Sequence, residues 1–94
     1  MADKRTVVAI TADTWVEIIN GAKTAKIKEK ISNVSYYSMV FDNNADVPAD
    51  VAPSAAATAE KIFESGNTEI LNDAALTYVW LRCSPGEVGS VIVT

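Results

Sequence analysis

Short runs rich in β-branched residues, in which apolar and polar side chains often alternate, recur along this chain of 94 residues. A period of two places successive side chains on opposite faces of a β-strand, whereas a surface helix repeats its apolar residues every three to four positions. Turn-forming residues separate the runs, above all Asn20-Gly21 and the cluster Ser84–Gly89. The pattern predicts strands at Thr6–Thr11, Trp15–Ile19, Thr24–Ile31, Val34–Phe41, Thr77–Cys83 and Ser90–Thr94.

The middle of the chain is open to two interpretations. Ser54–Glu64 is rich in alanine, and Gly66 follows it, so helix propensity and capping favour a helix. The same region also fits two short strands, Ile62-Phe63 and Thr68–Leu71, around a turn at residues 65–67. Packing decides between such alternatives, because propensity alone is a weak guide.

The sequence thus predicts an all-β fold: one compact antiparallel β-sandwich, or flattened barrel, of about seven or eight short strands. At most one helical turn is expected within Ser54–Glu64, and residues 1–94 are expected to form a single domain with one modest core. No apolar run approaches the roughly 18 residues that a membrane-spanning helix needs. Met1–Arg5 is not followed by the apolar core of a signal peptide, so the chain is expected not to be secreted.

Charge narrows the classes of partner. Eight Lys+Arg against twelve Asp+Glu give a net charge of −4. Binding to the phosphate backbone of a nucleic acid needs a basic face, so a nucleic acid is not the expected partner. Lys26, Lys28 and Lys30 would share one face of a strand with Thr24, and Ala25, Ile27 and Ile31 would share the other. The lysines are interpreted as the solvated face of an amphipathic strand, of the kind that protects a sheet edge. Binding to an acidic partner is the alternative.

The residues that usually carry catalysis are scarce. Histidine is absent, so the commonest general base and metal ligand is missing. The single cysteine, Cys83, lies in an apolar strand and is predicted to be buried and inert. Glu29 is the one carboxylate that alternates onto an apolar face, which could favour its protonated form as in a catalytic acid. It is instead interpreted as a residue near solvent at the end of its strand. The sequence therefore predicts no catalytic residue, no cofactor site and no enzymatic activity.

Two further groups of residues have a functional and a structural interpretation. Asp42, Asp46 and Asp50 are faintly calcium-like, but the glycine and the closing glutamate of a calcium loop are missing, so no metal site is predicted. Trp15 and Trp80 have β-branched neighbours in predicted strands, so they are expected in the core rather than on a sugar-binding platform.

The order of these segments resembles a known group of proteins. Tyr78–Thr94 places an aromatic-Val-Trp-x-Arg strand before a glycine turn and a terminal strand that ends in Val-Thr. In the first half, a lead strand precedes Trp15–Ile18, and a tyrosine-rich strand closes on an Asp/Asn loop. Over most of the chain this resembles small structural proteins of tailed bacteriophages: head decoration proteins, head-fibre bases and minor tail components. Pro85, Glu87 and the helix-like Ser54–Glu64 depart from that pattern.

The resemblance implies a compact β-sandwich on the virion, frequently a trimer. The expected function is to decorate or reinforce a tailed-phage capsid by binding the major shell protein, as a homo-oligomer and without nucleic acid or membrane. The alternative is a carbohydrate- or receptor-binding β-sandwich module of a phage tail or bacterial surface, using exposed rings such as Tyr36, Tyr37 or Tyr78.

The partner surface is expected on loops and chain ends, because strand faces in a small sandwich are committed to its own core. Two segments qualify: the N-terminal segment and the proline-containing loop Asp42–Ala59. Proline fixes the backbone angle φ, so this loop would lose little conformational entropy when it binds a partner. The predicted partner-binding residues are Met1, Ala2, Asp3, Lys4, Arg5, Thr6, Val47, Pro48, Val51 and Pro53.

Overall fold

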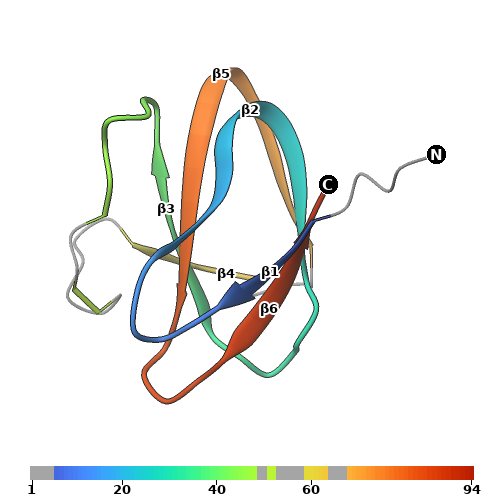
Figure 1. Cartoon of the computed structure of the whole chain (residues 1–94). Coiled ribbons are helices and arrows are strands. Elements are labelled where there is room, and N and C mark those ends of the chain that lie inside the picture. The colour runs from blue at the N-terminus through green and yellow to red at the C-terminus, as the bar shows by residue number, and fades with distance from the viewer. Residues whose placement is uncertain (1–5, 49–50, 53–58, 64–67) are drawn as a thin grey trace.

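A computed structural model describes residues 6–48, 51–52, 59–63 and 68–94, and it shows an all-β protein (Figure 1). All neighbouring strands are antiparallel and form one sheet in the order β1-β6-β2-β5-β3-β4. The described part contains no helix long and apolar enough to cross a membrane. The strands are β1 (Thr6–Ile10), β2 (Val16–Glu29), β3 (Tyr36–Phe41), β4 (Glu60–Ile62), β5 (Thr68–Cys83) and β6 (Gly89–Val93).

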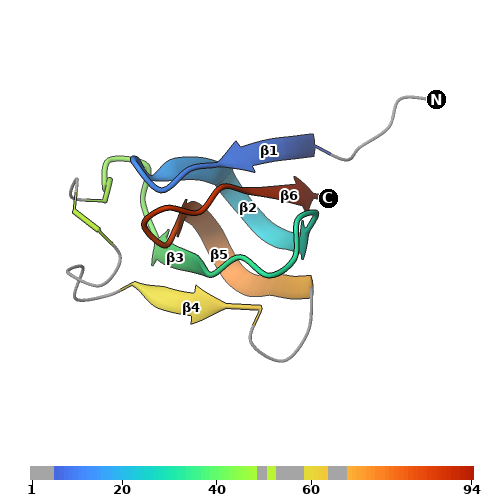
Figure 2. The same ribbon diagram turned by 90° about the horizontal axis from the view of Figure 1, so that it is seen from below.

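The sheet folds over on itself because its two long strands bend together. β2 and β5 form an arch, visible in Figure 1, and their register shifts at the bend. Ala22 pairs with Thr77 and Thr24 pairs with Asn72, so Lys23 alone faces the four residues 73–76. Such bulges increase twist and bend the strand. One half of the arch pairs with β3 and the other half with β6, which creates two facing layers (Figure 2).

The predicted fold class is confirmed, and the described residues contain six strands, fewer than the seven or eight expected. Trp15–Ile19 and Thr24–Ile31 were expected as separate strands around an Asn20-Gly21 turn, yet β2 runs through both. Gly21 has the positive φ expected there, 81°, but it serves a bend and not a hairpin turn. In the same way, β5 joins the strands expected at Thr68–Leu71 and Thr77–Cys83.

The middle segment follows the strand interpretation where the structure describes it. Glu60–Ile62 forms β4 and pairs with β3, so the described end of Ser54–Glu64 is a strand and not the helical alternative. Phe63 then takes a positive φ of 64° and ends the strand. Residues 53–58 and 64–67 lie outside the described residues.

The core lies between the two facing layers. Its members are mostly the inward-facing side chains of β2, β3, β5 and β6, with Ile10 from β1. One corner of the sheet is closed, because the N–H of Cys83 donates to the carbonyl of Thr11 at 3.0 Å. Trp15 is buried, as expected, but the expectation for Trp80 is wrong: it is only partly buried, alternates onto the face opposite Val79 and Leu81, and does not belong to the core cluster. The buried hydrophobic cluster comprises Ile10, Ile19, Ala25, Ile27, Tyr36, Val79, Leu81, Cys83 and Val91.

The lysine face of residues 24–30 is confirmed, although its strand is not at an edge. Ala25 and Ile27 are buried, whereas Lys26, Lys28 and Lys30 are exposed. β2 lies between β5 and β6, so Lys26 and Lys28 cover the outer face of a central strand, and Lys30 follows its end. Ile31 falls beyond the end of β2 and is exposed, contrary to the expected alternation.

Candidate functional site

The loop that follows β3 carries most of the described residues predicted to bind a partner. We define the apolar loop as residues 42–48 and 51–52. Its first part is stiffened by Asn43, whose Oδ1 accepts hydrogen bonds from the N–H groups of Ala45 (2.7 Å) and Asp46 (3.1 Å). The Asn43 amide also donates to the Asp46 carboxylate at 2.7 Å. Asn43 side-chain bonds of this kind fix a tight turn locally.

The far end of the apolar loop is held by two donors from the body of the protein. The carbonyl of Val51 accepts from Trp15 Nε1–H at 3.2 Å and from an Arg82 terminal nitrogen at 2.8 Å. Arg82 Nε donates in addition to the carbonyl of Ala12 at 2.8 Å. Arg82 is buried, so its charge must be satisfied by such acceptors. The guanidinium therefore ties β5 to the loop and to the β1–β2 connection.

Sequence reasoning did not assign this role to Arg82. A usable signal exists, because Arg82 stands between Leu81 and Cys83 in a strand without polar neighbours on either side. A buried arginine almost always needs specific partners. Which backbone carbonyls supply them depends on how the loop folds, and that is not a local property of the strand.

The anchored loop presents apolar groups to solvent. Val47 is 64% exposed and Val51 is 38% exposed, whereas Pro48 is partly buried. Beside them lies a hollow of about 190 Å³ lined by Thr14, Trp15, Val47, Pro48 and Trp80. The indole N–H of Trp80 is buried and has no hydrogen-bond partner among the residues that the structure describes. The combination suits contact with an apolar protein surface.

The structure does not bring all predicted partner-binding residues together. Thr6 begins β1 and is exposed, but the start of β1 and the apolar loop lie on opposite sides of the molecule in both views (Figures 1 and 2). Met1–Arg5 and Pro53 lie outside the described residues. The described part of the predicted surface is therefore the apolar loop, with Thr6 remote from it.

The aspartates of this loop form no metal site in the part of the chain that the structure covers. Asp42 and Asp46 are both exposed, and Asn43 already binds the Asp46 carboxylate. No group of three potential ligands among His, Cys, Asp and Glu is found in the described ranges. Asp50 lies outside them.

Tyr36 is a core residue and not part of an exposed aromatic platform. Its side chain is fully buried, and its ring meets that of Phe63 edge-on at a centroid distance of 5.3 Å. Its hydroxyl donates to the carbonyl of Ile31 at 2.8 Å and accepts from the N–H of Ser90 at 3.0 Å. Tyr78 is partly buried and its ring lies over Gly21. The expectation that Tyr36 is an exposed ring for sugar binding is therefore wrong.

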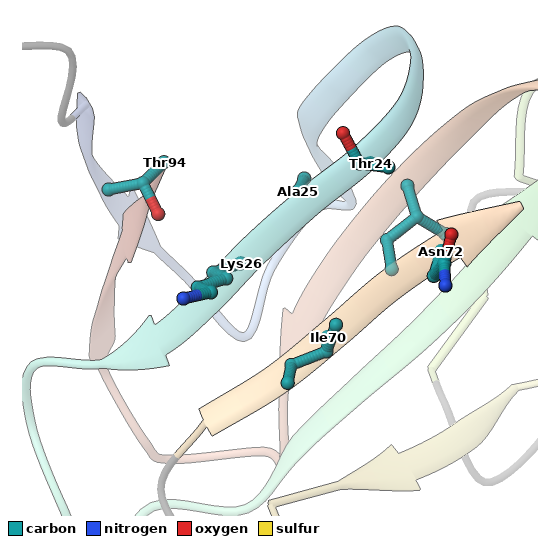
Figure 3. A pocket seen from close by; sticks show the side chains of 7 residues that line it. Thr24, Ala25, Lys26, Ile70, Asn72 and Thr94 are labelled. Carbon is teal, nitrogen blue, oxygen red and sulfur yellow. The ribbon is translucent and has the colours of Figure 1, made fainter.

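A second hollow lies on the outer face of the sheet. Figure 3 shows its side chains, which come from β2, β5 and the residue after β6. It measures about 500 Å³ and is wide open, with Thr24 and Lys26 on one strand and Ile70 and Asn72 on the next. These four residues are exposed. One lysine beside neutral groups provides no acid–base pair, so this hollow is not a candidate active site.

Comparison with known proteins gave no relative: no family model, no curated protein and no solved structure matches this chain.

Cys83 is buried, as the sequence predicted. Its Sγ lies 3.6 Å from the carbonyl oxygen of Ile10, to which the thiol donates. Burial, with a smaller contribution from Glu87, raises the pKa of this thiol from 9.0 to about 11. The thiolate is the reactive form of cysteine, so the folded protein keeps Cys83 in its unreactive form at neutral pH.

Cys83 is expected not to react with an aromatic disulfide reagent at about pH 8 while the protein is folded, and to react fully in urea. The unfolded chain releases the thiol proton near its pKa of 9.0, and the folded chain does so only near 11. The free energy of unfolding should therefore decrease as pH rises from about 9 to about 11. A Cys83→Ala variant lacks the thiol and is the control for every other source of pH dependence. An identical pH dependence of the unfolding free energy in both proteins would contradict the assignment of this effect to Cys83.

Proposed function

We propose that this protein is a structural virion component that decorates or reinforces a tailed-phage capsid by binding the major shell protein. Two observations support the proposal. The order of segments along the sequence resembles that of small phage structural proteins, and the apolar loop offers a surface for a partner. It places the protein on the virion, without a cofactor, nucleic acid or membrane as partner. A homo-oligomer, with a trimer favoured, is the expected state of assembly.

The observation that carries the proposal is the anchoring of Val51. Its carbonyl receives hydrogen bonds from Trp15 and from the buried Arg82, so the loop is held in place before any partner arrives. A preorganised loop loses less conformational entropy on binding, and this improves affinity without further contacts. Val47 and Val51 then supply exposed apolar area at the loop surface.

Assembly into oligomers would strengthen a weak single contact. A capsid presents many symmetric copies of its shell protein, so an oligomer can engage several at once and gain avidity. Oligomerisation would also stabilise a chain with a core of this size. Light scattering on the purified protein tests this part of the proposal, and a stable dimer at all concentrations argues against a trimer.

The test of the proposed function is binding of the purified protein to capsids that lack it. Val47→Asp is expected to weaken binding by about tenfold or more, because burying a carboxylate in an apolar contact costs at least about 1.4 kcal/mol. Val88→Asp is the matched control, since Val88 is similarly exposed (68%) but lies in the β5–β6 connection. Modest salt should not release the protein, because the contact is mainly apolar.

Three results would count against the proposal. Equal binding by Val47→Asp and the parent protein would exclude the apolar loop as the contact. Unchanged binding after removal of residues 1–6 would exclude the N-terminal segment as a contact. A parent protein that does not bind capsids, and in electron micrographs lies on the tail, would overturn the head assignment itself.

A further inference from the structure

We propose that a slot on the open side of the folded sheet binds the side chain of a lysine or arginine from a partner protein. The slot lies between β4 and the first half of β5, and its volume is about 180 Å³. Its polar lining residues are Ser38, Glu60 and Glu69, and its apolar walls include Ile27, Leu71 and Val79. None of these residues belongs to the apolar loop.

The strand registers direct both carboxylates into this slot. Glu60 on β4 is directly opposite Ser38 on β3, and Glu69 on β5 is directly opposite Ile27 on β2. Directly opposite residues of an antiparallel pair point to the same face. Since Ser38 and Ile27 are buried between the two layers, Glu60 and Glu69 lie on the inner sides of their strands; Glu69 is partly buried there, and Glu60 is exposed on the edge strand β4.

Ser38 adds a second, independent indication of a ligand. It is only 7% exposed and lines the slot, yet its hydroxyl makes no hydrogen bond with any residue that the structure describes. Trp80 Nε1 is the buried unpaired side-chain atom found among the described residues, and Ser38 Oγ is not, so the Ser38 oxygen stays accessible from the open slot. A donor that enters the slot would satisfy this oxygen.

Size and charge together define the occupant. Small-molecule pockets usually measure about 300–1,000 Å³, so a slot of about 180 Å³ suits one side chain better. Lysine and arginine bury an apolar stem and keep a cationic end near polar groups. The stem would lie against Ile27, Leu71 and Val79, and the cation would lie between Glu60 and Glu69. The six lining residues named here include no cation of the protein's own.

This inference rests on the proposed function in one respect: the capsid role identifies the partner protein. The binding of a basic side chain in the slot does not depend on that role. The shell protein would present the basic side chain, and the slot would orient the decorating protein relative to the contact made by the apolar loop. A merely protective role for Glu60, as an inward charge that discourages pairing at the edge strand β4, is the competing explanation.

The experiment is a titration of the isotope-labelled protein with n-butylammonium, which carries the stem and cation of lysine. Amide signals of Ser38, Ile27 and Glu69 are expected to shift in a saturable way, with a Kd on the order of 10 mM for so small a fragment. The n-pentanoate ion has a similar stem and the opposite charge, and it should cause no saturable shift.

Variants separate the slot from general charge effects. Glu60→Gln and Glu69→Gln keep the shape of the side chain and should each weaken binding about fivefold, equivalent to about 1 kcal/mol for a partly exposed ion pair. Glu17→Gln, on β2 outside the slot, should leave binding unchanged. Absence of saturable shifts up to about 50 mM, or equal binding by all three variants, would overturn the proposal. Because this titration contains no capsid, its result is independent of whether the protein binds capsids.

Discussion

A Gly89→Ala variant is expected to lose about 3 kcal/mol of folding free energy, at the upper end of the cost of an overpacked core. A Cβ atom on Gly89 would lie 2.6 Å from the hydroxyl oxygen of Tyr36 and would overlap ring atom Cε1. The ring cannot retreat, since Tyr36 is fully buried and its hydroxyl is bonded to Ile31 and Ser90. Urea unfolding followed by tryptophan fluorescence measures the loss.

Gly86→Ala is the matched control for this substitution. Gly86 has a φ of 83°, but nothing lies within 4 Å of the position of an added Cβ. Its alanine variant should lose only about 1–2 kcal/mol, which is the cost of placing an L-residue in the left-handed region. A Gly89→Ala variant no less stable than Gly86→Ala would contradict the close packing of Tyr36 on Gly89.

The second large effect is expected for Arg82→Met. This change removes the donors to the carbonyls of Ala12 and Val51 while it keeps an apolar stem of similar length. Hydrogen bonds from a charged group are worth about 1.5–3 kcal/mol each, and part of this is recovered because no charge remains buried. We expect a net loss of about 3 kcal/mol in urea unfolding, together with faster amide exchange in residues 43–48.

Trp15→Phe provides the comparison for Arg82→Met. It removes the other donor to the Val51 carbonyl and leaves the guanidinium in place, so the loss should be about 1 kcal/mol from the hydrogen bond. Weaker capsid binding by Arg82→Met, measured where the variant is still folded, would link the anchored loop to the proposed function. Unchanged amide exchange in the loop of that variant would show that Arg82 does not hold it.

The class of the fold and the faces of its strands followed from local patterns. Alternation with a period of two determines which side chains share a face, whatever the strand pairs with. The alternation therefore places Lys26 and Lys28 outside and Ile27 inside, whichever strands pair with theirs. Cys83 was recognised as buried by the same argument, because its neighbours in the strand are apolar.

The bend of the long strands was decided by tertiary structure. Asn20-Gly21 supplies a residue with positive φ, and both a hairpin turn and a bend can use one. A hairpin would return the chain onto its own preceding strand. Here both halves of β2 pair with β5 instead, so Gly21 bends a continuous strand.

The candidate sites were the least predictable part, because they depend on contacts between residues far apart in the sequence. The apolar loop could be located from its prolines, but its anchoring needs Trp15 and Arg82 to meet the carbonyl of Val51. The slot needs Glu60 on β4 and Glu69 on β5 to line the same hollow. Local sequence determined the β-strands and their faces, since these depend on neighbouring residues. Only the tertiary structure decided which strands pair, where they bend and which distant polar groups meet, because those outcomes depend on packing across the whole chain.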